Sequence, residues 1–465
     1  MNRILIVGAG FSGTAIAAQL LRHAANNPMC IYLINSGGPI ARGMAYGTQS
    51  PAHVLNVPAG NMSAFVEDPS HFVRFAQTMD ASITEGSFVS RRIYGDYLEF
   101  TLGEAERNSK ADVELIRIYK QVIGIDANVV SGDGSLVTLE NGEVIEVDKV
   151  ILAPGHFASN QLPLTDMSFY GSERYVHDPW DYAALDRIPA RAPVLLLGSG
   201  LTAVDVAITL LRRNPIRKIT MISRRGLLPQ AHRHIATAPL HSTTAHIWAG
   251  ANTVRTQMRA LRKYCRLLTN QGRDWREALA ILRPVTAAIW QSYSEKERRR
   301  FCRHVQPFWD THRHRIAPLV AEQLFAAVND GVISTLAGRI SGLSFDGENV
   351  QATLRRRGLS SLQFELTQYV VNCTGPCSNP RQVDAPLMQQ LLGDGILRPD
   401  KLGLGIDVAP DCAVVAADGQ VSQNIFYIGP WLKARYWEAT AVPDLRVIAI
   451  KLAQRIVLDI SAPNP

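Results

Sequence analysis

The sequence predicts an α/β protein with two Rossmann-like dinucleotide-binding domains, β-meanders and a mostly helical insertion. Two copies of one pattern carry this prediction. Residues 3–7 form an apolar run that leads into GAGFSG at residues 8–13, and apolar residues at helical spacing follow. Residues 192–197 lead in the same way into GSGLTA at residues 198–203, and a second helical pattern follows. A strand, a glycine-rich turn and a helix in this order form the phosphate-binding start of a dinucleotide-binding domain.

Each glycine of the first turn has a physical role. Gly8 allows the turn, Gly10 lets the backbone approach a pyrophosphate, and Gly13 lets the helix pack closely on the strand. The start of the helix offers unpaired N–H groups and a partial positive charge to the phosphates. An ordinary tight turn is the alternative, but the position between strand and helix favours a dinucleotide site. In the second copy Ala203 replaces the third glycine, which is a known variant.

The composition is that of a globular protein. The 465 residues suffice for two or three domains, and 46% of them are hydrophobic while 19% are charged. The net charge of +7 fits anionic cofactors as well as nucleic acid, so we expect no nucleic-acid partner. No apolar run approaches the length of a membrane span, and the first strand begins at residue 3, without room for a signal peptide. We therefore expect a cytoplasmic protein without membrane association.

The six cysteines do not form a recognisable redox or metal motif. Only Cys373 and Cys377 are close in sequence, with three residues between them, whereas dithiol and zinc sites usually have two. We expect reduced, structural cysteines and no metal site.

After the first helix, residues 30–35 predict a second strand. It ends at Asn35, where an Asp or Glu commonly contacts the ribose hydroxyls and where an amide can do the same. Residues 41–59 are too rich in glycine and small residues for a helix and too irregular for a strand. A loop in this place runs along an extended cofactor, so we predict a cofactor-covering segment, with a plain surface loop as the alternative.

An antiparallel meander is predicted next. Residues 113–125, 136–139 and 144–147 alternate apolar and polar side chains and are separated by turn residues. The meander leads into residues 149–155, a buried strand that ends in Gly155 and so allows close approach to a ligand.

The second copy differs from the first at the end of its second strand. Residues 218–223 are followed by Arg224 and Arg225 instead of an acid, and two guanidinium groups suit the 2′-phosphate of NADP. Solvated surface arginines are the alternative. Residues 350–366 predict a second meander, and residues 369–375 repeat the strand that ends in glycine.

A helical insertion at about residues 240–330 interrupts the second copy and is rich in Arg and His. The run at residues 298–300 is best explained as a solvated helix face. The sequence HRHR at residues 312–315 is a poor metal site, because the alternating arginines would repel a cation. We predict instead that Arg313 and Arg315 bind an anion of the substrate or of NADP.

The C-terminal part returns to the first domain. Residues 424–430 predict a strand and a turn, and residues 444–457 a closing helix. Trp431, Tyr436 and Trp437 either flank a flavin or pack in the core. The predicted boundaries are 1–188 for the first part of the FAD domain, 189–376 for the NADPH domain with its insertion, and 377–465 for the second part of the FAD domain.

The chain resembles the two-dinucleotide FAD/NAD(P)-binding proteins that include a bacterial urate hydroxylase and an aspartate N-monooxygenase. The resemblance extends along the chain and rests on these motifs: GAGFSG at 8–13, RGMAYGT at 42–48, LNVP at 55–58, SRRGLLP at 223–229 with His232, RHRIAP at 313–318 and WEATAVP at 437–443.

The resemblance implies FAD on the first copy, NADPH on the second, and O2 as co-substrate. The implied FAD contacts are Gly8, Gly10, Phe11, Ser12, Gly13, Asn35, Arg42, Gly43, Ala45, Tyr46, Asn56, Val122, Gly155, Gly429, Trp437, Thr440 and Ala441. The implied NADPH contacts are Gly198, Ser199, Gly200, Leu201, Thr202, Arg224 and Arg225.

The expected activity is that of an FAD-dependent, NADPH-consuming monooxygenase acting through a flavin C4a-hydroperoxide on a small polar substrate. Such chemistry needs positioning and exclusion of water more than an acid or base, which is consistent with the lack of a triad or paired carboxylates. N-hydroxylation of an amino-acid-like compound is favoured over ring hydroxylation of a urate-like heterocycle. An NAD(P)H dehydrogenase or oxidase and a non-catalytic redox sensor stay open, as does assembly into a homo-oligomer.

Overall fold

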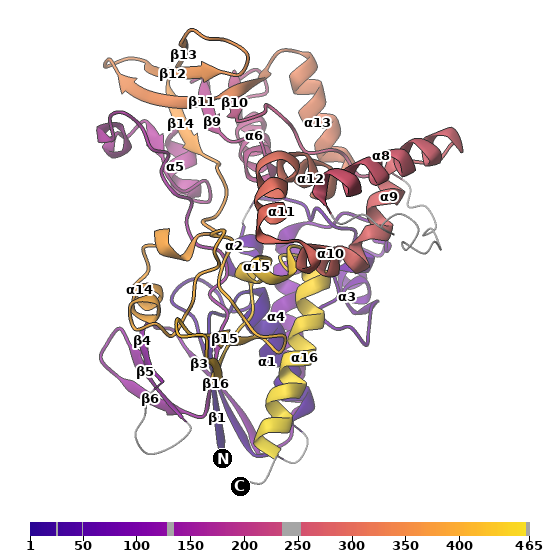
Figure 1. Cartoon of the computed structure of the whole chain (residues 1–465), viewed down its shortest axis with the longest axis vertical. Coiled ribbons are helices and arrows are strands. Elements are labelled where there is room, and N and C mark those ends of the chain that lie inside the picture. The colour runs from indigo at the N-terminus through magenta and orange to yellow at the C-terminus, as the bar shows by residue number, and fades with distance from the viewer. Residues whose placement is uncertain (25–26, 49, 128–133, 235–252, 462–465) are drawn as a thin grey trace.

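The α/β prediction is confirmed: a computed structural model shows two lobes, each built on a largely parallel sheet, with a helical segment beside them (Figure 1). The structure describes residues 1–24, 27–48, 50–127, 134–234 and 253–461. The N-terminus lies at the far end of the first lobe, at the bottom of Figure 1, and the chain passes to the second lobe and back. No helix in these described ranges combines the length and apolarity needed to cross a membrane.

The first lobe contains a six-stranded sheet in the order β15-β16-β7-β1-β2-β3. Every neighbouring pair is parallel except β15 and β16. Ile4, Leu5 and Ile6 are fully buried, as expected for a parallel strand covered on both faces. The strands are β1 (Asn2–Val7), β2 (Met29–Ile34), β3 (Val113–Ile118), β7 (Lys149–Leu152), β15 (Ala413–Val415) and β16 (Val421–Tyr427).

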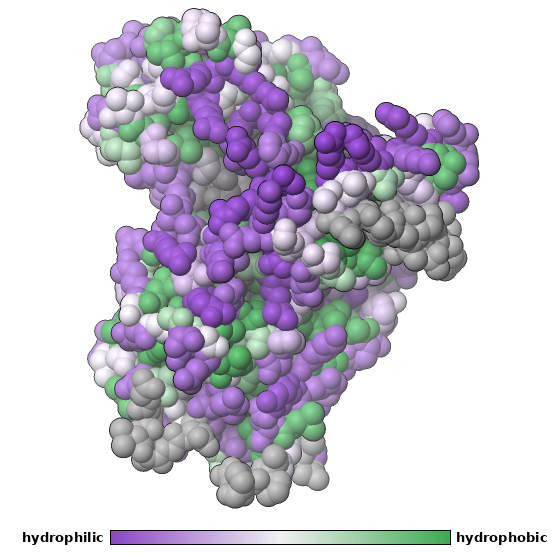
Figure 2. Space-filling view, in the orientation of Figure 1, coloured by the Kyte–Doolittle hydropathy of each residue, from purple (hydrophilic) through white to green (hydrophobic). Residues whose placement is uncertain are grey.

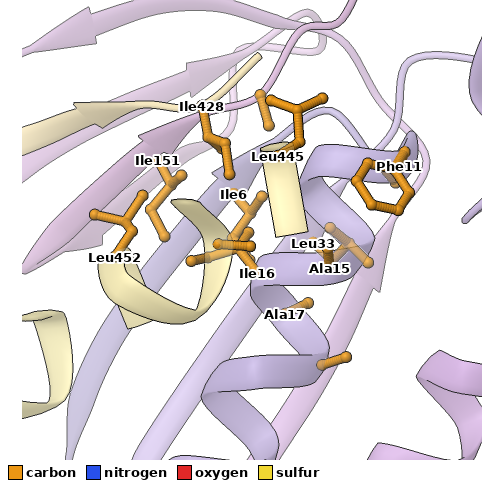
Figure 3. Packing of buried hydrophobic residues seen from close by; sticks show 14 of the residues in the cluster. Ile6, Phe11, Ala15, Ile16, Ala17, Leu33, Ile151, Ile428, Leu445 and Leu452 are labelled. Carbon is orange, nitrogen blue, oxygen red and sulfur yellow. The ribbon is translucent and has the colours of Figure 1, made fainter. Parts of the chain in front are cut away.

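Two helices cover the core below the first glycine turn. α1 (Phe11–His23) packs against the closing helix α16 (Val442–Ser461), which begins two residues before the predicted start. Figure 3 shows Ile6 of β1, Ile16 of α1 and Leu452 of α16 directed into one apolar cluster. All three are at most 2% exposed, so their close packing fixes the strand and the helix on either side of the glycine turn.

One predicted strand belongs to a different sheet from the one expected. Residues 113–118 form β3, which pairs in parallel with β2, and are not part of the meander. Alternation of buried and exposed residues is shared by hairpin strands and by the edge strand of a parallel sheet, so the pattern did not separate the two. The meander consists of β4 (Val122–Asp126), β5 (Ser135–Leu139) and β6 (Val144–Val147).

The predicted loop at residues 41–59 contains helical turns, which is a second correction. Gly43–Tyr46 forms α2, although the glycine content argued against a helix. Its four residues need only one turn, which glycine does not prevent. The remaining elements of this lobe are η1 (Ala59–Asn61), α3 (His71–Met79), α4 (Arg91–Arg107), η5 (Pro380–Gln382), α14 (Pro386–Gly393), η6 (Pro430–Leu432) and α15 (Lys433–Tyr436).

The second lobe contains a seven-stranded sheet in the order β13-β12-β11-β10-β9-β14-β8. Its boundary differs from the prediction, because Tyr175–Val176 (β8), placed by sequence in the first domain, pairs in parallel with β14. The other elements are η2 (Ser168–Gly171), α5 (Tyr182–Arg187), β9 (Val194–Leu197), α6 (Leu201–Arg213), β10 (Ile219–Ser223), α13 (Pro318–Asn329), β11 (Ile333–Phe345), β12 (Val350–Arg356), β13 (Gln363–Thr367) and β14 (Tyr369–Asn372). The predicted second meander corresponds to β11, β12 and β13.

The helical insertion is confirmed from residue 253 onward, and residues 240–252 of the predicted insertion lie outside the described part of the chain. Its elements are α8 (Val254–Asn270), α9 (Trp275–Leu282), η3 (Arg283–Val285), α10 (Thr286–Ser292), α11 (Glu295–Arg300), the π-helical turn η4 (Phe301–Val305) and α12 (Gln306–Arg313). The insertion is joined to the first lobe by Trp437, whose ring centroid lies 4.6 Å from that of Trp290 and 4.8 Å from that of Phe301.

Candidate functional site

One large cavity of about 1590 Å³ is lined by both lobes and by the insertion. The glycine turns of the two lobes reach it from different sides, with Gly8 and Gly10 from the first and Gly200 from the second. Two segments that follow parallel strands, at Gly155 and Gly375, also line it. The cavity therefore lies at the carboxyl ends of strands from both sheets, where ligands bind in open α/β folds.

The first glycine turn is held by close backbone contacts. Gly8 has φ +100°, and a Cβ at this position would lie 2.3 Å from the carbonyl oxygen of Ala153. A Cβ at Gly13 would lie 1.9 Å from the carbonyl oxygen of Gly8. Gly10 caps α1 without a side-chain hydrogen bond, so the first N–H groups of the helix are open to a ligand.

The second glycine turn has the same backbone construction. Gly198 has φ +129°, and a Cβ there would lie 2.2 Å from the carbonyl oxygen of Cys373. Gly200 caps α6 without a side-chain hydrogen bond, and a Cβ built on it would meet no described atom within 4 Å. Both turns thus present a helix start with free N–H groups to the same cavity.

Most predicted cofactor residues line the cavity. In the first lobe these are Gly8, Gly10, Phe11, Ser12, Asn35, Arg42, Gly43, Ala45, Tyr46, Asn56, Val122, Gly155, Thr440 and Ala441. In the second lobe they are Gly200, Leu201 and Thr202. Gly13, Gly198 and Ser199 lie behind the two turns, where they shape the backbone, and Gly429, Trp437, Arg224 and Arg225 also lie outside the lining.

Asn35 keeps an acceptor for a ribose. Its amide nitrogen donates to the carbonyl oxygens of Gly37 and Gly38, both at 2.9 Å, and so closes the turn after β2. Asn35 lines the cavity, and its amide oxygen is not used by these two hydrogen bonds. The amide thus stabilises its own turn as well as offering one hydrogen-bond acceptor.

The guanidinium of Arg42 is already engaged. It donates to Glu99 at 2.6 Å and to Asp96 at 2.5 Å, and its side chain is 16% exposed. The hydrogen bond to Glu99 is the main reason why the pKa of Arg42 is raised. Arg42 therefore fixes α2 against α4 and brings little free charge to a cofactor phosphate.

In the segment WEATAVP at residues 437–443, the first residue packs on the insertion and later residues line the cavity. Trp437, with φ +61°, is 3% exposed and packs on the insertion, so its ring has a structural role and does not line the cavity. Thr440 and Ala441 line the cavity just before α16. Glu438 also lines it, accepts from the indole of Trp309 at 2.9 Å and forms an ion pair with Arg313 at 2.8 Å.

The two arginines predicted to bind an anion differ in their surroundings. Arg313 is neutralised by Glu438, so it is not a free anion-binding group. Arg315 lines the cavity and forms no ion pair with any described carboxylate. Burial, and then the charges of Arg313 and Arg276, lower the pKa of Arg315 to about 10. Arg315 remains cationic at neutral pH and is the better candidate for an anion.

Ion pairing distinguishes Arg315 from most other cations of the cavity wall. Arg91, Arg233, Arg276 and Arg283 each pair with an Asp or Glu within 3.2 Å. Lys433 is a further cation without a described carboxylate partner, and its ammonium lies 4.4 Å from the ring centre of Trp437. The wall thus carries few cations that an anionic ligand could neutralise.

His232 and Glu438 are cavity residues whose roles the sequence did not reveal. His232 Nε2 donates to the carbonyl of Asn56 at 3.0 Å and so links the second lobe to the first. Burial, followed by the charge of Arg315, lowers the pKa of His232 to about 3. No spacing rule joins Glu438 to Arg313 or His232 to Asn56, because each pair is separated by more than a hundred residues.

Comparison with known proteins supports a two-dinucleotide fold. Residues 5–157 match the sequence model of a family described as FAD-NAD(P)-binding, while no curated protein sequence matches. The fold is similar to L-lysine 6-monooxygenase from Pseudomonas syringae (16% identity, 99% of each chain covered, TM-score 0.67) and to an ornithine N-hydroxylase from Kutzneria sp. 744 (14%, 99% of each chain, 0.63). It is also similar to thioredoxin reductase from Lactococcus lactis (11%, 99% of each chain, 0.52). These identities establish a shared fold.

Proposed function

We propose that this chain is an NADPH-dependent flavin monooxygenase that hydroxylates the nitrogen of a small, amino-acid-like compound with an anionic group. The observation that carries the proposal is that two uncapped glycine turns, one per lobe, open into one cavity. Two dinucleotides bound at such turns would meet in the space between the lobes. The similarity of fold to amine-hydroxylating monooxygenases supports this reaction class.

The first turn fits the pyrophosphate of FAD. A Cβ at Gly10 would lie 3.6 Å from Gly43 Cα, so the backbone at this point leaves room that a side chain would fill. Asn35 offers an acceptor for the ribose, and Gly155 has φ +75° with no described atom within 4 Å of a built Cβ. Thr440 and Ala441 would approach the flavin ring from the start of α16, whose partial positive charge favours a reduced flavin. Bound FAD supplies transfer of one oxygen atom from O2 after reduction by NADPH.

The second turn fits NADPH in the same manner. Gly200, Leu201 and Thr202 would contact its pyrophosphate from the start of α6. Asp205, one turn further along α6, is neutralised by its ion pair with Arg91 at 2.8 Å, which reduces its repulsion of the pyrophosphate.

Arg315 is the residue that we assign to substrate binding. A guanidinium can hold a carboxylate with two parallel hydrogen bonds, and Arg315 lacks a described carboxylate partner of its own. Arg313, neutralised by Glu438, would position the neighbouring backbone.

Neutral histidines on the wall suit an amine substrate. Burial lowers the pKa of His314 to about 4 and that of His232 to about 3, so both rings are uncharged at pH 7. They do not repel an ammonium group, and because His232 Nε2 donates to Asn56, its Nδ1 is left as an acceptor. An imidazole with so low a pKa is too weak a base to take the proton of an ammonium group. His232 Nδ1 would therefore orient the amine by accepting a hydrogen bond.

The similarity to thioredoxin reductase favours a second candidate, an NAD(P)H dehydrogenase or oxidase that does not insert oxygen. One experiment separates the two. The purified protein is reduced with NADPH or NADH without oxygen, oxygen is then admitted, and hydroxylated product and peroxide are measured with L-ornithine, L-lysine, L-aspartate and urate.

Hydroxylated amine formed in step with NADPH consumption is the expected result. Formation of peroxide alone with every compound would favour the oxidase, and a protein that takes up no FAD would contradict both candidates. With a compound that is hydroxylated, we expect Arg315→Met to raise KM about 100-fold or more, the loss of a bidentate charged contact. A KM within about threefold of wild type would exclude the assigned role of Arg315.

A further inference from the structure

The adenosine end of NADPH would reach the carboxyl end of β10, where the helical insertion meets the second lobe. The 2′-position of the ribose lies at the end of the second strand of a dinucleotide-binding domain. Here that strand is β10, and Arg224 and Arg225 follow it directly. The loop is anchored to the glycine turn because Ser199 Oγ donates to the carbonyl of Leu227 at 2.6 Å and lies within hydrogen-bond distance, 2.8 Å, of Ser223 Oγ.

Arg225 is held by the insertion. Its guanidinium lies over the ring of Phe308, 4.9 Å from the centroid, and its Nη2 donates to the carbonyl of Arg303 at 3.4 Å. Arg224 is exposed. Stacking on an aromatic face fixes the plane of a guanidinium while leaving its remaining N–H groups free to donate.

Arg303 meets Arg225 through its backbone carbonyl and carries a further positive charge on an exposed side chain of the insertion. It belongs to the π-helical turn η4, a kind of helix irregularity that is frequent at functional sites. Its inward neighbour Phe301 is 7% exposed and packs on Trp437, while Arg303 itself is exposed and forms no ion pair with a described residue. The π-helical turn thus places the ring of Phe301 in the interior and the guanidinium of Arg303 at the surface.

The surroundings leave the charge of Arg303 uncompensated. Arg303 lines a shallow depression of about 440 Å³ together with Lys296, His304 and the pair Glu295–Arg299. Glu295 is already bound by Arg299 at 2.8 Å. Figure 2 shows that hydrophilic residues predominate over α8 and α11 on this side of the insertion. The depression is lined by residues of the insertion, and an anion beside Arg303 would be attracted by its guanidinium without competition from the paired carboxylate of Glu295.

We propose that Arg303 and Phe308 of the insertion complete a 2′-phosphate subsite with Arg224 and Arg225, so that the phosphate of NADPH is recognised by two separate elements of the chain. Arg224, Arg225 and Arg303 contact the phosphate, and Phe308 is a positioning residue that orients Arg225. This inference rests on the proposed use of NADPH and adds the insertion as a determinant of nucleotide specificity. We therefore expect the insertion to add no binding affinity for NADH, which lacks the 2′-phosphate.

The test measures nucleotide binding in the absence of turnover. The purified full-length protein is titrated calorimetrically with adenosine 2′,5′-bisphosphate and with 5′-AMP, which differ by the 2′-phosphate. We expect Arg303→Gln to weaken bisphosphate binding about fivefold or more, as for the loss of one charge-assisted contact, and Phe308→Leu about threefold. Binding of 5′-AMP should stay within about twofold in both variants, because only the 2′-phosphate is affected. Arg262→Gln, which removes one exposed charge from α8 of the same insertion, should leave both affinities within about twofold.

Several outcomes overturn the inference in distinguishable ways. If Arg224→Gln and Arg225→Gln weaken bisphosphate binding but Arg303→Gln does not, the insertion has no part in the subsite and the proposed NADPH site stands. If Arg303→Gln weakens both nucleotides equally, its contact is not with the 2′-phosphate. If the wild type does not prefer the bisphosphate, the proposed NADPH specificity fails as well. An unchanged midpoint of thermal unfolding in each variant excludes misfolding as the cause.

Discussion

The two glycine turns have the same backbone and different surroundings. The residues that cap α1 and α6 have φ, ψ of −78°, −163° at Gly10 and −86°, −165° at Gly200. Gly8 and Gly198 both have positive φ and contact the carbonyl that ends a neighbouring parallel strand. A short sequence motif therefore sets the same phosphate-binding geometry twice in one chain.

The differences begin at the third position of the motif. A Cβ at Gly13 would collide with the carbonyl of Gly8, whereas Ala203 carries a Cβ and is fully buried. The first helix thus lies closer to its turn than the second. The first turn is also covered by its own lobe, at Gly43, whereas Gly200 faces open space.

The largest expected effect comes from exchanging the third residues of the two motifs. We expect Gly13→Ala to destabilise the protein by about 3 kcal/mol or more and to abolish FAD retention, because neither of the two backbone segments in contact can move freely. The reciprocal Ala203→Gly should cost about 1 kcal/mol, the helix propensity of glycine. Urea unfolding and the ratio of flavin to protein measure both. Equal losses of unfolding free energy in the two variants would show that both helices pack equally closely on their glycine turns.

A second prediction concerns the contact that joins the lobes beside the second turn. Arg91 of α4 and Asp205 of α6 form an ion pair at 2.8 Å with side chains only 13% and 14% exposed. We expect Asp205→Ala to cost about 1–3 kcal/mol, because Arg91 loses its charged partner in a largely buried place. The control is Asp186→Ala, whose pair with Arg213 involves a carboxylate that is 71% exposed and should contribute at most about 0.5 kcal/mol. Urea unfolding that shows no difference between the variants would mean that the lobes do not depend on the Arg91 pair.

The residues after the second strands provide a third prediction. Asn35→Ala removes two hydrogen bonds that close a turn, so we expect a loss of about 1–2 kcal/mol of stability. Arg224→Ala removes an exposed side chain and should change stability by less than about 0.5 kcal/mol while weakening NADPH binding. Chemical unfolding combined with NADPH titration measures both. If Arg224→Ala lowered stability as much as Asn35→Ala, Arg224 would have a structural role in place of the predicted role in NADPH binding.

The last prediction is a pH dependence at His232. Its pKa is lowered in the folded protein, so the unfolded chain binds a proton that the folded chain does not, and stability falls as the pH decreases from about 6.5 toward about 3. We expect the slope contributed by His232 to be at most about 1.4 kcal/mol per pH unit. His232→Gln, whose amide can still donate to Asn56, should show a shallower decline in unfolding free energy between pH 6.5 and 5. Identical slopes would mean that His232 is not held neutral by the fold.

Strands, glycine turns and the long helices were predictable because each follows from residues that are neighbours in sequence. Both motifs, the closing helix and the insertion were found in this way. The assignment of residues 113–118 failed because partners of a strand are chosen across the sheet, and the alternating pattern is the same for either partner. The boundary at residue 188 failed for a similar reason, since β8 has only two residues and is defined by its pairing with β14.

By itself the sequence determined that the chain carries two dinucleotide-binding turns, since glycine spacing between a strand and a helix is a local property. Only the tertiary structure decided which charges around the cavity are free. Arg313 and Arg315 are two residues apart and equivalent in sequence, yet Glu438 reaches Arg313 from the C-terminal segment and leaves Arg315 without a described carboxylate partner. The same holds for Arg225, which meets Arg303 and Phe308 only because the insertion folds back on the second lobe. Charge compensation acts through space, so residues distant in sequence decide which of two like side chains is left to bind a ligand.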